Sequence, residues 1–116
     1  MPSPSSARPS VNAPNTHTIL LMQPEQARQS RTFYDFSTLR LALTGLTEIF
    51  QEILRRFNPG KKELSYTMAD LHRYIDSVPD LSMLVYDAGT RQYQPLTKQA
   101  VKGLLQDLVT NGGGKK

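Results

Sequence analysis

The chain has 116 residues, of which 38% are hydrophobic and 21% charged, and it contains no cysteine. This length suggests one domain, and the lack of cysteine excludes a disulfide framework, a thiolate zinc site and a thiol nucleophile. Between His17 and Asn111, eleven Lys and Arg residues face ten Asp and Glu residues, so only +1 of the net charge of +4 belongs to this segment, which is weak evidence for a nucleic-acid surface.

The two ends of the chain differ in composition from its middle. Residues 1–16 hold four of the eight prolines together with several serines, which predicts a disordered leader. Residues 112–116 read GGGKK and predict a flexible tail, so the folded domain is expected over residues 17–111. No apolar run approaches the ~20 residues of a membrane span.

Two strands are predicted at the start of this domain. Residues 18–23, with the sequence TILLMQ, are apolar and end at Pro24. Residues 31–36, with the sequence RTFYDF, are rich in aromatic and β-branched side chains. The polar loop between them is typical of an antiparallel hairpin.

A long helix is predicted to follow, with Ser37 or Thr38 as its N-cap and Asn58-Pro59 at its end. Its apolar residues are spaced alternately four and three apart, which keeps one stripe on one face for over five turns. These residues are Leu39, Leu43, Leu46, Phe50, Ile53 and Phe57.

The second half of the domain repeats strands and shorter helices. Thr67 and Asp70 are spaced as a capping box at the start of a short helix that Pro79 ends. Residues 81–86 and 91–96 predict a second hairpin, and Thr97 predicts the cap of a last helix. The order β-β-α-α-β-β-α indicates an α+β fold, with a four-stranded antiparallel sheet and three helices on one face.

The strands predict that the other face of the sheet is also apolar. Ile19 and Leu21 point away from Leu20, whereas a sheet covered on one side only should alternate cleanly between apolar and polar residues. We therefore expect a homodimer through this face, although a loop or the last helix that wraps round would be an alternative cover. The residues expected at the dimer interface are Ile19, Leu21, Phe33 and Tyr93.

Several stretches of the chain resemble the enhancer of rudimentary family. They are HTILLMQP at 17–24, RTFYDF at 31–36, DLSMLVY at 80–86 and YQP at 93–95, together with Asn58-Pro59. The resemblance runs from His17 to about Val109. It implies a non-enzymatic α+β homodimer in which Ile19 and Leu21 contact the second copy. It also implies a scaffold in RNA metabolism, gene silencing and small-RNA biogenesis that binds short segments of RNA-binding and RNA-processing proteins.

The chain also departs from the pattern of this family. The family usually carries a large aromatic residue where Ala100 stands, and the Ser/Pro leader is additional. Thr32 with Asp35 keeps an acidic kinase site of the family, so Thr32 is a candidate phosphorylation site, whereas residues 38–41 lack the acidic residue of the second such site. These differences indicate a divergent member or a paralogue.

No catalytic, metal or cofactor site is predicted from the sequence. His17 and His72 are the only histidines, and a metal site needs three or four converging ligands. Neither a Gly-x-Ser-x-Gly elbow nor a glycine-rich phosphate loop is present. We therefore expect a protein that is not an enzyme. A separate expectation is that it acts in the nucleus or the cytoplasm, including ribonucleoprotein granules.

Two further groups of residues are candidates for binding. Leu41, Ile49 and Leu54 lie off the main stripe of the long helix and predict a surface for a partner's short helix or extended segment. The alternative is direct RNA binding through phosphate contacts, although a helix end and a solvated loop also explain the basic residues concerned. These residues are Arg55, Arg56, Lys61 and Lys62.

Overall fold

The computed structural model describes residues 9–61 and 65–113, and it confirms the predicted fold class. The strands are β1 (Thr18–Gln23), β2 (Thr32–Phe36), β3 (Asp80–Asp87) and β4 (Gln92–Leu96). The helices are α1 (Leu39–Phe57), α2 (Met68–Ser77) and α3 (Lys98–Asp107), with a 3-10 turn at Arg28–Ser30 and a final π-helical turn at Leu108–Gly113.

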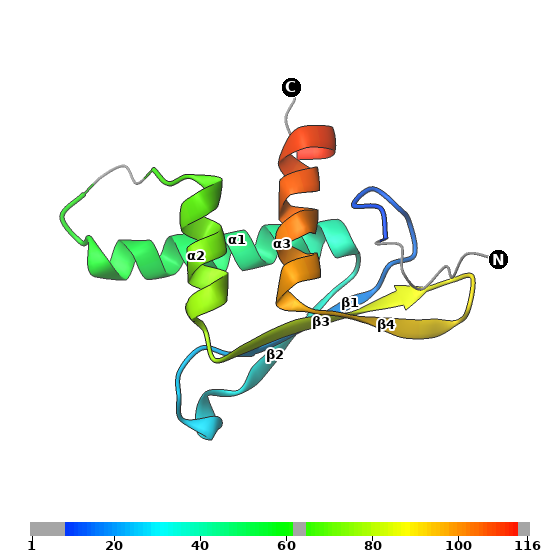
Figure 1. Ribbon diagram of the computed structural model, residues 1–116, viewed down its shortest axis with the longest axis horizontal. Coiled ribbons are helices and arrows are strands. Elements are labelled where there is room, and N and C mark those ends of the chain that lie inside the picture. Colours follow the sequence, from blue (N-terminus) through cyan, green and yellow to red (C-terminus); the bar gives the residue numbers. More distant parts are fainter. Residues whose placement is uncertain (1–8, 62–64, 114–116) are drawn as a thin grey trace.

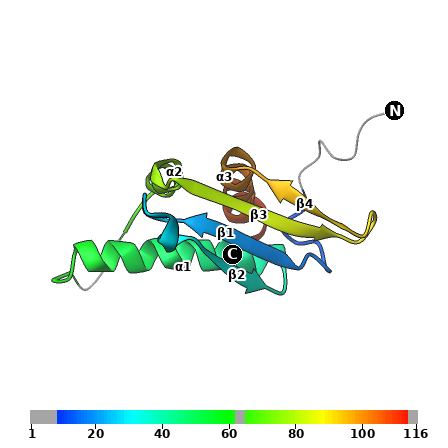
Figure 2. The same cartoon turned by 90° about the horizontal axis from the view of Figure 1, so that it is seen from below.

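The four strands form one antiparallel sheet in the order β2-β1-β3-β4, so β2 and β4 are its edges. All three helices lie on the same side of this sheet (Figure 1). Figure 2, seen from below, looks onto the opposite side of the sheet, which none of the described helices covers. Pro95 sits on the edge strand β4, where its missing N–H group breaks no interior ladder.

The core fills the space between the helices and the covered side of the sheet. Leu20 on β1 and Met83 on β3 are paired across the ladder, and both are fully buried. Full burial of one such side chain contributes about 1.5–3 kcal/mol relative to exposure. The helices contribute Leu39, Leu43, Leu46, Phe50, Leu71, Ile75, Val101, Leu104 and Leu105.

Threonine side chains cap all three helices at the predicted positions. Thr38 accepts a hydrogen bond from the backbone of Leu41, and Thr97 accepts one from the backbone of Ala100. Thr67 and Asp70 form the complete reciprocal capping box that their spacing predicts. Each such cap contributes about 1 kcal/mol.

The C-terminal end of α1 departs from the predicted stripe. Phe57 was expected to face the core, but 80% of it is exposed, and Ile53 is only half-buried. The reason is the length of α1, which runs past the end of the sheet (Figures 1 and 2). The last turn therefore continues the apolar spacing of α1, but it has no sheet beneath it to bury Phe57.

Part of the predicted leader lies against the body of the domain. Residues 1–8 are outside the described residues, but Val11 is 5% exposed and belongs to the core. The hydroxyl of Thr16 accepts a hydrogen bond of 2.9 Å from the backbone N–H of Leu39, at the start of α1. The Arg40 guanidinium donates one of 2.7 Å to the side chain of Asn12. Residues 9–16 are therefore held to the domain by one core side chain and by hydrogen bonds to the start of α1.

Candidate functional site

The side of the sheet without helices forms a largely apolar surface, which we call the open face. The strand register places Ile19 beside Leu84, and Leu21 beside Phe33. Tyr86 and Tyr93 form another cross-strand pair on the same side. The apolar members of the open face are Ile19, Leu21, Phe33, Leu84, Tyr86, Tyr93 and Pro95.

All four residues expected at the dimer interface lie on the open face. Ile19 and Leu21 come from the central strand β1 and are half-buried by their neighbours. Phe33 and Tyr93 come from the two edge strands, with 68% and 43% of each residue exposed. Contiguous apolar surface that spans a whole sheet is typical of a face that another molecule covers.

A row of hydrogen-bonded side chains crosses one end of the open face. His17, just before β1, bonds through Nδ1 to the Tyr93 hydroxyl at 2.8 Å and through Nε2 to a carboxylate oxygen of Asp35 at 2.5 Å. The backbone oxygen of His17 accepts a hydrogen bond from Tyr86 N–H, which fixes its place beside β3. We call Asp35, His17 and Tyr93 the polar row. These residues are distant in sequence and are brought together only by the strand register, so no local pattern predicts the polar row.

The predicted partner-binding residues of α1 occupy different places. Leu41 is 50% exposed, whereas Ile49 and Leu54 are partly buried against the core. Ile49 lines a cavity of about 590 Å³ between α1, α2 and the edge strand β2, and neither Leu41 nor Leu54 lines it. We call this cavity the α1–β2 groove, and its apolar lining comprises Met22, Tyr34, Ile49, Ile53, Phe57 and Tyr74.

Tyr74, one of the residues that line the α1–β2 groove, carries an unpaired polar group. Its hydroxyl is buried and has no hydrogen-bond partner among the described residues. Burial raises the pKa of Tyr74, and the neighbouring Tyr34 raises it further, so the phenol stays neutral and able to donate. A buried donor without a partner costs about 1–3 kcal/mol. No sequence pattern indicates this feature, because the burial of the Tyr74 hydroxyl depends on tertiary packing.

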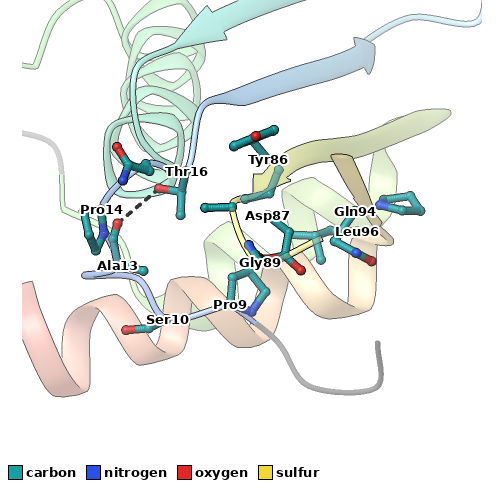
Figure 3. Close-up of a pocket in the computed structure, with 14 residues that line it drawn as sticks. Pro9, Ser10, Ala13, Pro14, Thr16, Tyr86, Asp87, Gly89, Gln94 and Leu96 are labelled. Carbon is teal, nitrogen blue, oxygen red and sulfur yellow. Dashed lines mark hydrogen bonds between the residues drawn. The ribbon is translucent and has the colours of Figure 1, made fainter. Parts of the chain in front are cut away.

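A second cavity, of about 360 Å³, lies between the N-terminal segment and the β3–β4 hairpin. Pro9, Pro14 and Thr16 line one side of it, and Tyr86 and Gln94 line the other (Figure 3). The cavity is not predictable from composition, which indicates disorder for the residues that form one of its sides.

The predicted basic cluster is partly paired. Arg55 makes an ion pair of 3.2 Å with Glu52, and Arg56 lines the α1–β2 groove. Lys61 is exposed in the loop after α1, while Lys62 lies outside the described residues. The described cations therefore do not form one unpaired patch.

Thr32, the candidate phosphorylation site, is exposed at the start of the edge strand β2. Asp35, the acidic residue of that site, bonds to His17 in the polar row.

Within residues 9–61 and 65–113, no three His, Cys, Asp or Glu side chains gather as a metal site. The helices of the same residues include none with the length and hydropathy of a membrane span.

Comparison with known proteins gives one consistent family. Residues 14–111 match the family model described as Enhancer of rudimentary. The "Enhancer of rudimentary homolog" of Caenorhabditis elegans is 38% identical over 96 residues, which cover 83% of this chain and 93% of the relative. The protein of the same name from Arabidopsis thaliana is 38% identical over 86 residues, covering 74% and 79%. "Protein enhancer of rudimentary" of Drosophila virilis is 36% identical over 87 residues, covering 75% and 84%.

Proposed function

Since the chain belongs to the enhancer of rudimentary family, we propose that it is a non-enzymatic homodimeric scaffold for RNA-processing and RNA-binding proteins. Its two copies pack through their open faces, and the dimer binds short segments of those partners. It acts in RNA metabolism, gene silencing or small-RNA biogenesis, in the nucleus or the cytoplasm.

The observation that carries this proposal is the apolar character of the open face. Ile19 and Leu21 on β1 are flanked by Phe33 on one edge strand and by Leu84 on β3. The helices of the described residues lie on the other side of the sheet (Figure 2). A second open face supplies the matching surface, because a two-fold contact pairs each patch with itself and aligned sheets pack about 10 Å apart.

The α1–β2 groove is the proposed site for partner segments. It offers apolar walls from Ile49, Ile53 and Phe57. An apolar side chain of a partner segment that fills the groove would contact these walls. A dimer presents two such grooves, which raises the effective concentration for multivalent partners.

The dimer is tested by placing charges on the open face. We expect Ile19→Arg combined with Leu21→Arg to yield a monomer or an insoluble chain, because arginines cannot be buried there without partners. Leu41→Arg changes an exposed leucine on α1 and is the matched control, which should leave the molar mass unchanged. Light scattering measures the mass, and a double variant that remains a soluble dimer would contradict the proposal.

The groove is tested by crosslinking mass spectrometry on captured partners. Phe57→Asp alters an exposed groove residue and is expected to remove crosslinks between partner segments and α1, while Val109→Asp, at a site exposed elsewhere, should retain them. Equal crosslinks in both variants would place the partner site on another surface.

RNA bound directly with a Kd below ~10⁻⁶ M and a steep salt dependence would instead favour the alternative of an RNA-binding module.

A further inference from the structure

The polar row places a histidine and a carboxylate in direct contact on the open face. The side chain of His17 is 37% exposed and that of Asp35 is 65% exposed in a single protomer, so both contact water there. Histidine gains a proton between about pH 8 and pH 5. Any molecule that covers the open face removes this row from water.

Both charge states of His17 fit the same geometry. Neutral His17 donates from Nε2 to the Asp35 carboxylate and accepts at Nδ1 from the Tyr93 hydroxyl. Protonated His17 donates from both nitrogens, and the Tyr93 oxygen becomes the acceptor. The row therefore changes its net charge from −1 to 0 on protonation without any rearrangement of side chains.

The groups that face His17 come from each of the other strands. β2 supplies Asp35, β3 supplies Tyr86, and β4 supplies Tyr93, whose ring centroid is 5.8 Å from that of His17. Among the described residues, Arg91 lies in the β3–β4 turn, two residues before Tyr93, whereas Arg31 and Asp80 lie at the opposite end of this side of the sheet. There Arg31 donates to the Gln23 side chain at 2.8 Å, and Asp80 is the ladder partner of Gln23.

From this arrangement we propose that association through the open face takes up protons at His17, so that the dimer becomes tighter as the pH falls from about 8 to 6. The proposal rests on the function proposed above, since it concerns the same interface. An unpaired carboxylate is expensive to bury, whereas a carboxylate paired with imidazolium is much less so. The dimer therefore binds more protons than two separate protomers, and by linkage its association strengthens with acidity.

The size of the effect follows from the number of rows. Each row takes up at most one proton on burial, and a two-fold dimer contains two rows. Each full proton changes the dissociation constant about tenfold per pH unit. With partial uptake, we expect the dimer to be about tenfold tighter at pH 6 than at pH 8.

The test measures the dissociation constant of the full chain at pH 8, 7 and 6 by fluorescence-detected sedimentation at constant ionic strength. We expect the wild type to tighten and His17→Gln to show no trend. Asp35→Asn should show the opposite trend, because protonated His17 then lacks its carboxylate and opposes burial. His72→Gln removes the other histidine, on α2, and should keep the slope of the wild type.

The possible results separate this inference from the function on which it rests. A wild-type dimer whose affinity is constant, or falls, between pH 8 and 6 overturns the inference alone. A slope lost in His72→Gln but kept in His17→Gln also overturns it. A chain that stays monomeric at every pH and concentration instead contradicts the proposed dimer. Circular dichroism at each pH checks that all variants remain folded.

Discussion

The two faces of this sheet are built from neighbouring residues and meet very different surroundings. Leu20 points to the helices and is fully buried, whereas Leu21, the next residue, points to the open face and is only half-buried. Met83 and Leu84 repeat the contrast on β3. Both faces are apolar, but only one of them has helices of its own chain to cover it.

This contrast separates the residues that stabilise the folded protomer from the residues that are available to bind another molecule. Residues of the covered face lower the free energy of a single protomer, because they leave water as soon as the chain folds. Residues of the open face gain the rest of their burial only when another molecule arrives. Substitutions on the two faces should therefore change different measurements.

The largest expected effect compares Leu20→Ala with Leu21→Ala. Leu20→Ala leaves a cavity in the core and should lower the free energy of unfolding by about 3 kcal/mol, as urea denaturation would measure. Leu21→Ala should leave the circular dichroism spectrum unchanged and raise the dissociation constant of the dimer in sedimentation. Equal losses of folding stability with no change in association would erase the proposed difference between the faces.

A smaller effect on the free energy of unfolding is expected in residues 9–16. Like the covered face of the sheet, this segment contributes a buried side chain to the protomer. Val11→Ala should lower the free energy of unfolding by about 1–2 kcal/mol, because it removes a side chain that is 5% exposed. Ser10→Ala, at an exposed position of the same segment, is the control and should stay within about 0.5 kcal/mol of the wild type. Two indistinguishable urea curves would show that the segment adds nothing to folding.

The smallest effect concerns the capping box of α2, far from the open face. Hydrogen bonds from Thr67, and to a lesser degree the nearby Arg73, hold the pKa of Asp70 below its usual value. A lowered pKa in the folded state means that the stabilisation is present above the unfolded pKa and fades as the pH falls through the folded one. Asp70→Asn should therefore melt below the wild type at pH 7 and match it in strong acid. A constant difference in melting temperature would contradict this.

Local patterns were sufficient to predict most of the fold. The apolar spacing of α1, the threonines at positions 38, 67 and 97, and the alternation along β1 each depend on residues close in sequence. The same alternation predicted the side of the sheet on which Ile19 and Leu21 lie. That side follows from a period of two alone, without any knowledge of tertiary contacts.

The features that the sequence did not predict depend on distant or isolated residues. His17 is 18 positions from Asp35 and 76 from Tyr93, so only the ladder register could reveal the polar row. Val11 is a buried side chain in a segment rich in proline and serine. The composition of that segment predicts disorder and gives no indication that one of its side chains joins the core. Phe57 kept the helical period, but no periodicity shows where the sheet beneath the helix ends.

The most direct test of this account is the mass of the wild-type chain in solution. Sedimentation equilibrium at micromolar concentration should give twice the 13.0 kDa of one chain. Hydrogen exchange on the same sample should show slower exchange on β1 than in the variant that carries arginine at positions 19 and 21. A well-folded particle of 13.0 kDa at every concentration would mean that the open face remains in water, and the scaffold built on it would be wrong.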